Sequence, residues 1–393
     1  MQQSLLLPTL FLGFYFSSGC VSKQSSQAPI DYGLKYSQKN FQAMPGALPL
    51  RPFRSGLIKL SPELDAQKPL AQADFAGWVA ANNYLIGSPE PKWIAAYLLP
   101  HIKPSWWLQA PDDLTAPPKV SGNQLLLGFR DGSLWNVNLK TGQPTWKQKI
   151  SSFATREMRL LGNTLLIVTA NQTLYALNSE NGSIKWIYDA KKSETLSIHN
   201  TSAPTVYKKM IFFGLSSGEV AAVDFKTGEG IWSHSPAFSD SRFHDAIGEI
   251  MAIDTIIITA RFDGIISAIN IDKPKKEVGS WKSPKKISSI TAAKFRHGRF
   301  YVGTHNGFIH AFNPRTGQEL WKSQIGTSIN NISTGESNLY VSASDGRICS
   351  LDSNTGKIIW HDQVEGNVVG KPLYINRNIF FQTGLNVFYG YKL

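Results

Sequence analysis

The residues best suited to chemistry in this sequence are few and widely separated. Cysteines stand at positions 20 and 349, and three histidines, His297, His305 and His310, fall close together. We expect these histidines on a turn and on different strands, and no HExxH or CxxC spacing joins any pair as metal ligands. Cys349 lies in an alternating apolar strand, which is typical of a small buried side chain. The sequence therefore predicts no catalytic residue, no metal site and no other cofactor site.

Cys20 follows a segment with the composition of an export signal. Residues 4–16 form an apolar run that is too short and too interrupted by proline for a comfortable transmembrane helix. The small residues 17–19 give a peptidase access to the backbone, and the Cys20 thiol can then carry a lipid. The segment resembles a bacterial lipoprotein signal peptide, and Val21 after the cysteine then implies sorting to the outer membrane. An ordinary cleaved signal peptide with an incidental cysteine is the alternative.

Composition divides the rest of the chain into three parts. Residues 21–60 are rich in Ser, Gln and Lys at their start and predict a flexible tether. Residues 61–100 predict a small helical segment, because Phe75, Trp78 and Val79 would share one helical face. We expect this segment to pack against the main domain. Residues 101–393 contain internal repeats and form that domain.

The repeats end on a tryptophan and recur every 39 to 49 residues, at Trp107, Trp146, Trp186, Trp232, Trp281, Trp321 and Trp360. Two clear copies are DGSLWNVNLKTGQPTW (131–146) and NGFIHAFNPRTGQELW (306–321). Each has a tight Gly turn, an alternating strand, a second Gly turn and the tryptophan strand, after an apolar β-branched run. Four-stranded sheets repeated with a period near 40 predict an all-β propeller. We expect each tryptophan to pack between neighbouring blades.

The two ends of the repeat region predict how the ring closes. The last copy, 371–393, has no tryptophan strand, whereas HIKPSWWLQA (101–110) is a tryptophan strand with no preceding copy. We expect residues 101–110 to complete the C-terminal blade, because this pairing removes exposed sheet edges. The result is seven blades. Eight is the alternative, if residues 61–100 hide a degenerate blade.

The repeat resembles the pyrroloquinoline-quinone-like (PQQ-like) propeller repeat, and the domain resembles the BamB family of outer-membrane assembly lipoproteins. The resemblance is strongest in SRFHDAIGEIMAIDTIIITARFDGIISAINI (241–271). It implies a non-catalytic, lipid-anchored scaffold on the periplasmic face of the outer membrane. It also implies Arg242, Phe243 and Asp245 as partner-binding residues, although Ile247 replaces a second acidic residue common in the family. The alternative is that this loop only joins two blades.

The same resemblance implies the partners. They are a BamA-like barrel-assembly protein, unfolded outer-membrane proteins and the membrane itself through the anchor at Cys20. Nucleic acid is not expected, because the chain carries an export signal. The formal net charge of +12 favours anionic partners without choosing among them.

Two other functions stay open from the sequence. One is an envelope propeller that binds cell wall or polysaccharide, for which the nine Lys and Arg residues within 273–299 would provide a basic surface. The other is a quinoprotein (PQQ-dependent) dehydrogenase, because such enzymes have related propellers. The pair of adjacent cysteines found in those enzymes is missing here.

Overall fold

The computed structural model describes residues 58–59, 77–89, 91–99, 103–190, 202–234, 245–274, 281–282, 287–375, 378–384 and 387–392. The chain divides into two units, Met1–Ala47 and Leu48–Leu393, and all of the described residues belong to the second. The expected leader (1–20), the expected tether apart from residues 58–59, and residues 61–76 of the expected helical segment lie outside the described residues.

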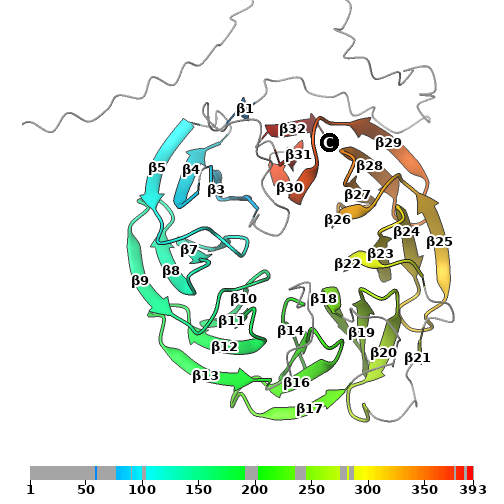
Figure 1. The fold of residues 1–393 in the computed structure, drawn as a ribbon, viewed down its shortest axis with the longest axis horizontal. Helices are drawn as coiled ribbons and strands as arrows, with labels where there is room; N and C mark the ends of the chain where they lie inside the picture. Colours follow the sequence, from blue (N-terminus) through cyan, green and yellow to red (C-terminus); the bar gives the residue numbers. More distant parts are fainter. Residues whose placement is uncertain are drawn as a thin grey trace, which may run out of the picture. The chain divides into compact units, whose positions relative to one another are not determined.

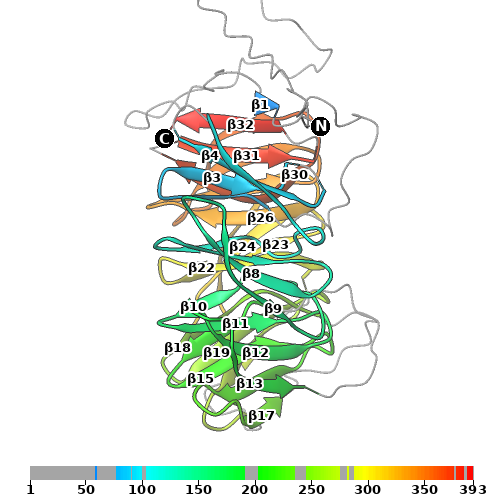
Figure 2. The ribbon, with the colours of Figure 1, turned by 90° about the vertical axis from the view of Figure 1, so that its left-hand side faces the viewer.

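The described residues form eight four-stranded antiparallel sheets. The sheets are the blades of a β-propeller, and the first strand of each blade lies nearest the centre of the ring (Figure 1). Figure 2 shows the same ring from its side, with the sheets stacked along its circumference. The expected all-β propeller is therefore confirmed. It has eight blades, which was the alternative prediction, and not seven.

The strands of each blade follow one another in the chain, apart from β1. Blade 1 consists of β2 (Val79–Ala81), β3 (Tyr84–Gly87), β4 (Trp93–Leu98) and β5 (Lys103–Gln109). Blade 2 consists of β6 (Lys119–Ser121), β7 (Gln124–Gly128), β8 (Ser133–Asn138) and β9 (Pro144–Lys149). Blade 3 consists of β10 (Arg159–Leu161), β11 (Thr164–Val168), β12 (Thr173–Asn178) and β13 (Ile184–Asp189). Blade 4 consists of β14 (Thr205–Tyr207), β15 (Met210–Gly214), β16 (Val220–Asp224) and β17 (Gly230–His234). Blade 5 consists of β18 (Ala246–Ile253), β19 (Ile256–Arg261), β20 (Ile266–Asn270) and β21 (Trp281–Lys282).

The remaining blades complete the ring. Blade 6 consists of β22 (Ile290–Arg296), β23 (Arg299–Thr304), β24 (Phe308–Phe312) and β25 (Glu319–Gln324). Blade 7 consists of β26 (Ile329–Thr334), β27 (Asn338–Ala343), β28 (Arg347–Asp352) and β29 (Ile358–Gln363). Blade 8 consists of β30 (Val368–Ile375), β31 (Asn378–Thr383), β32 (Val387–Lys392) and β1 (Ile58–Lys59).

The expectation of helices in residues 61–100 is wrong for residues 77–99, which form three strands and their connections. Asn82 and Asn83 adopt positive φ angles of 49° and 64° and turn the chain between β2 and β3. Residues 85–86 and 94–97 are all buried, because both faces of this sheet are covered. Apolar residues on both faces leave no alternation, so periodicity did not distinguish strand from helix.

The expected pairing of residues 101–110 with the C-terminal blade is also wrong. Strand β5 pairs with β4 inside blade 1, and β1 closes the ring by pairing with β32. An N-terminal strand does complete the last blade, but it comes from earlier in the chain because blade 1 needs β5 as its own fourth strand. Trp78 and Tyr97 of blade 1 share a buried cluster with Leu373 and Phe388 of blade 8.

The core of the protein lies between blades. One buried cluster joins Leu126 and Leu134 of blade 2 to Leu165, Ile167 and Tyr175 of blade 3, and the other clusters join neighbouring blades in the same way. A single blade exposes two apolar faces, so burial requires a neighbour on each side. Burial of this kind makes the ring a rigid support for the loops at its two ends.

From blade 2 onward, the recurrent tryptophans whose side chains are described contact the next blade, as expected. The Trp146 indole Nε1 donates to the Ser179 carbonyl at 2.9 Å, and its ring lies against Gly182 of blade 3. In blade 1 this position is held by Trp106, whose Nε1 donates to the Leu139 carbonyl at 2.8 Å. The sequence series began at Trp107, one residue too late, because the two adjacent tryptophans cannot be told apart by spacing.

Candidate partner-binding site

Asp245 is the one described residue of the expected partner loop, since Arg242 and Phe243 lie outside the described residues. It directly precedes β18, and its exposed fraction is 0%. Its backbone carbonyl accepts a hydrogen bond of 2.9 Å from the Phe262 amide. Asp245 therefore forms the buried base of the loop, and its role in partner binding stays a prediction.

The turn that holds Asp245 joins β19 to β20. The Gly264 amide donates to the Arg261 carbonyl at 3.0 Å, and Gly264 has a φ of +86°. A Cβ on Gly264 would stand 2.0 Å from the Ile287 carbonyl oxygen, so only glycine fits. The Arg261 guanidinium donates to the Asp263 carboxylate, and both side chains are almost fully buried. This buried ion pair fixes the turn, and the turn fixes the base of the loop.

A second charged residue near Asp245, Arg156 of blade 3, was missed by sequence reasoning. Arg156 lies close enough to Asp245 for their charges to interact. Burial lowers the pKa of the Arg156 guanidinium, and the negative charge of Asp245 opposes this shift. The backbone amide of Thr155, the residue before Arg156, donates a hydrogen bond to the second strand of blade 3. The Thr115 amide makes the same hydrogen bond in blade 2, so Ala116 holds the position that corresponds to Arg156. The sequence signal that could have identified Arg156 was a charged residue at a repeat position where another copy has alanine.

Two glutamates join non-neighbouring blades near the centre of the ring. The Glu157 carboxylate contacts Lys371 of blade 8 and lies 3.6 Å from Lys119 of blade 2. The Glu249 carboxylate of blade 5 lies 3.1 Å from Arg159 of blade 3. It also accepts from Lys294 of blade 6 at 2.7 Å. These four ion pairs connect five blades across the interior, so the first strands are held together beyond their contacts with neighbours.

The Glu157 contacts predict a pH-dependent stability. Burial would raise the pKa of this carboxyl, but the charges of Lys371, Lys119 and Arg159 outweigh burial and lower the pKa from 4.5 to about 2. The stabilisation is therefore fully present above pH 4.5 and is lost as the pH falls toward 2.

Glu157→Gln should accordingly lower the melting temperature at pH 7 by roughly 1–2 °C, a small change because the carboxylate is 39% exposed. Differential scanning calorimetry of the two proteins from pH 7 to pH 2 measures the difference. It should shrink as the pH falls, and a difference that stays constant over this range would contradict the assignment.

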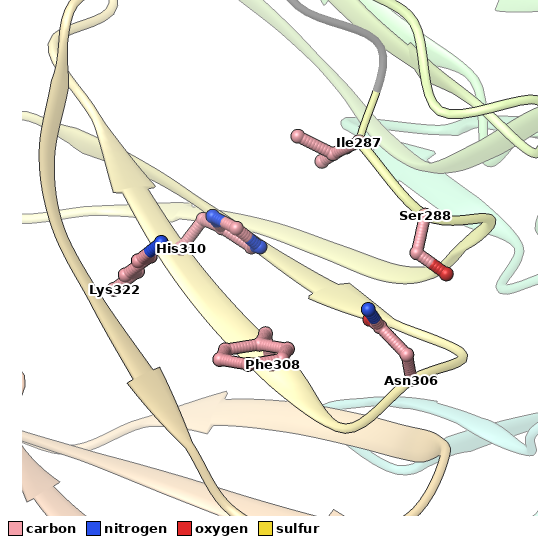
Figure 3. Close-up of a pocket in the computed structure, with 6 residues that line it drawn as sticks. All are labelled: Ile287, Ser288, Asn306, Phe308, His310 and Lys322. Carbon is pink, nitrogen blue, oxygen red and sulfur yellow. The ribbon is translucent and has the colours of Figure 1, made fainter.

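One cavity of about 200 Å³ lies beside β24 and β25 of blade 6 (Figure 3). It is lined by Ile287, Ser288, Asn306, Phe308, His310 and Lys322. Burial lowers the pKa of His310, which is only partly opposed by Glu319, so the imidazole is neutral at pH 7. The cavity holds one neutral histidine beside one lysine, without an acidic partner among its lining residues.

Other chemistry-bearing features are structural in the described residues. GLSSG (214–218) matches the GxSxG spacing of a nucleophile elbow, but it connects two strands, whereas an elbow connects a strand to a helix. Cys349 is buried, and burial raises the pKa of its thiol to about 12. Among the described residues, no group of three or more His, Cys, Asp or Glu side chains could hold a metal ion. The same residues include no helix long and apolar enough to cross a membrane.

Solved structures share this fold at low sequence identity. BamB from Moraxella catarrhalis aligns with a TM-score of 0.68 and 19% identity, covering 82% of this chain and 97% of that one. The quinohemoprotein alcohol dehydrogenase from Comamonas testosteroni aligns with a TM-score of 0.62 and 12% identity, covering 81% and 74%. Identities this low support the shared fold alone.

Sequence comparison adds family membership. Outer membrane protein assembly factor BamB from Yersinia pestis is 26% identical over 207 residues, which are 51% of each chain. Tetrathionate hydrolase from Acidithiobacillus ferrooxidans is 24% identical over 247 residues, which are 56% of this chain and 47% of the enzyme. This chain thus spans about half the length of the curated relatives it matches. The family model described as outer membrane protein assembly factor BamB matches residues 93–323 and 305–392. The chain therefore belongs to the family of the outer membrane protein assembly factor BamB.

Proposed function

We propose that this protein is a non-catalytic scaffold in the assembly of outer-membrane β-barrel proteins, anchored by a lipid on Cys20 to the periplasmic face of the outer membrane. The observation that carries this proposal is the family match over residues 93–392 of the propeller. The rigid ring supports it, because loops on a rigid support commonly carry binding function.

The partner-binding loop would present Arg242 and Phe243 to a BamA-like barrel-assembly protein. Asp245 is buried at the base of this loop, so it positions the two residues and leaves the direct contact to them. Its support is the Phe262 amide and the charge of Arg156. Unfolded outer-membrane proteins would bind by adding a strand to an open sheet edge, where backbone hydrogen bonds provide affinity without sequence specificity.

The experiment is affinity purification of the full-length tagged protein from detergent-solubilised envelope. We expect recovery of the barrel-assembly protein, and about a tenfold loss of recovery for the double variant Arg242→Ala and Asp245→Ala. The control is the double variant Asp254→Ala and Arg315→Ala, which removes an exposed ion pair elsewhere on the ring.

Two results would contradict the scaffold. One is recovery of no barrel-assembly component by the unchanged protein. The other is equal recovery by the loop variant and the control. Circular dichroism of each variant separates loss of binding from loss of folding, which matters for the buried Asp245.

The likeness to a tetrathionate hydrolase and to quinohemoprotein dehydrogenases favours a second candidate, an enzyme. A quinoprotein would show dye-linked alcohol dehydrogenase activity after incubation with pyrroloquinoline quinone and calcium. We expect no such activity and no absorbing cofactor after gel filtration. Retained quinone with dye reduction would replace the scaffold proposal.

A further inference from the structure

Blade 1 exposes an aromatic surface on one face of its outer strands. Trp93 and Trp107 are 36% and 42% exposed, and they are the only tryptophans among the ten large apolar side chains exposed in the described residues. The Trp107 ring centroid lies 6.3 Å from those of both Trp93 and Tyr97. Gln109 is exposed and pairs with Trp93 on the neighbouring strand. We call Trp93, Trp107 and Gln109 the blade-1 aromatic face, and buried Tyr97 supports the Trp107 ring from below.

Among the described residues, the preceding blade covers little of this face. At the seam between blades 2 and 3, the six-residue outer strand β9 brings Trp146 onto the next blade. At the seam between blades 8 and 1, the outer strand β1 has two residues and no tryptophan. The buried cluster at this seam consists of Trp78, Leu85, Ala95 and Tyr97 of blade 1 with Leu373 and Phe388 of blade 8. The outer part of the seam is thus left open in the described residues.

The chemistry of the face suits the interfacial region of a membrane. Tryptophan rings prefer the headgroup level, where an apolar ring and a polar N–H are both satisfied. Exposed lysines lie next to the face, Lys92 before β4 and Lys103 at the start of β5. Among the described residues, the acidic groups beside it are Asp112 and Asp113, and the Asp113 carboxylate accepts a hydrogen bond from the Lys92 backbone amide at 3.1 Å. The chain as a whole carries a net charge of +12, which favours anionic lipid.

The position of the face points to the same partner. The first described strand after Cys20 is β1, which belongs to blade 8, the neighbour of blade 1 (Figure 1). The 38 residues from Cys20 to Ile58 would have a root-mean-square span of about 35 Å as a flexible coil. A lipid at Cys20 would then be connected to the propeller on the side of this seam.

We propose that the blade-1 aromatic face contacts the anionic headgroup region of the membrane that carries the anchor. The contact orients the ring with the seam between blades 8 and 1 toward the lipid. This inference rests on the lipid anchor in the proposed function and adds a second attachment point. A second contact of this kind adds buried apolar area and headgroup attraction to the lipid anchor, so it strengthens retention at the membrane.

Vesicle flotation tests the contact without the anchor. The full chain carrying Cys20→Ser is floated with phosphatidylcholine vesicles, with and without phosphatidylglycerol. We expect binding that requires phosphatidylglycerol and weakens about tenfold in the double variant Trp93→Ala and Trp107→Ala. Ile187→Ala is the matched control, because Ile187 is 51% exposed and pairs with the third strand of blade 3 as Trp107 does in blade 1. Equal weakening in this control would overturn the proposal.

A fluorescent label provides a second measurement that does not depend on removing tryptophan. Gln109→Cys is labelled with an environment-sensitive dye in the Cys20→Ser protein, and buried Cys349 stays unmodified. We expect a blue shift when phosphatidylglycerol vesicles are added, and none for the same label at Ile187→Cys. A label that is already blue-shifted without vesicles would mean that the chain itself covers the face. A shift caused only by the purified barrel-assembly protein would assign the face to a protein partner. Either result overturns the membrane contact, and the affinity purification above reports separately on the scaffold.

Discussion

Replacing Trp106 by alanine is expected to lower the free energy of unfolding by about 3–5 kcal/mol. The Trp106 side chain is only 9% exposed and fills the seam between blades 1 and 2. Its ring lies against Gly142, where a Cβ would stand 2.7 Å from the indole. The variant also leaves the buried Leu139 carbonyl without its 2.8 Å indole donor. Urea denaturation followed by circular dichroism measures the change.

The neighbouring residue provides the matched control. Trp107 has the same chemistry and the adjacent position, but it is 42% exposed and points away from blade 2. Trp107→Ala should cost clearly less, about 1–2 kcal/mol, because 42% of its surface is already exposed in the folded protein. Equal losses in the two variants would contradict the assignment of Trp106 as the interblade contact.

Replacing Asp263 by alanine is expected to cost about 3–5 kcal/mol, because it removes the carboxylate that balances the buried Arg261 guanidinium. The side chains of this pair are 2% and 0% exposed, so solvent cannot replace the lost charge. The same urea titration measures the loss. Affinity purification of the variant should also recover less barrel-assembly protein, since the turn around Phe262 holds the Asp245 carbonyl.

Asp254→Ala is the control for this second change. Asp254 and Arg315 form an ion pair whose side chains are 61% and 66% exposed. An exposed pair contributes about 0–1 kcal/mol, because water and salt screen it. The assignment of the Arg261–Asp263 pair as a structural anchor would be wrong if Asp254→Ala destabilised the protein as much as Asp263→Ala.

Local patterns predicted most of the blades. In residues 306–321, the Asn-Gly turn, the alternating strand and the closing Trp321 are all where the repeat placed them. Hairpins of this kind depend on residues that are neighbours in the chain, so a few consecutive residues are enough to predict them. Blade 1 shows the limit of this reasoning. Its strands lack the Gly turns of the repeat, and residues 94–97 are buried on both faces, so the sequence indicated helices there.

The sequence by itself determined the repeating sheet and the tryptophan contacts between blades. The role of the loop residues Arg242, Phe243 and Asp245 stays a prediction from the family resemblance. Only the tertiary structure decided the number of blades and the strand that closes the ring. A tryptophan strand such as 103–109 has the same local signal whichever sheet it joins, and its partner is fixed by the sheet that lacks a fourth strand.

The charge contacts around the site were likewise decided by the ring. Arg156 and Asp245 are 89 residues apart, and Glu157 and Lys371 are 214 residues apart. No local pattern relates residues at such separations. Their attraction requires a distance of a few ångströms between charged atoms, and that distance exists only after the blades have packed into a closed circle.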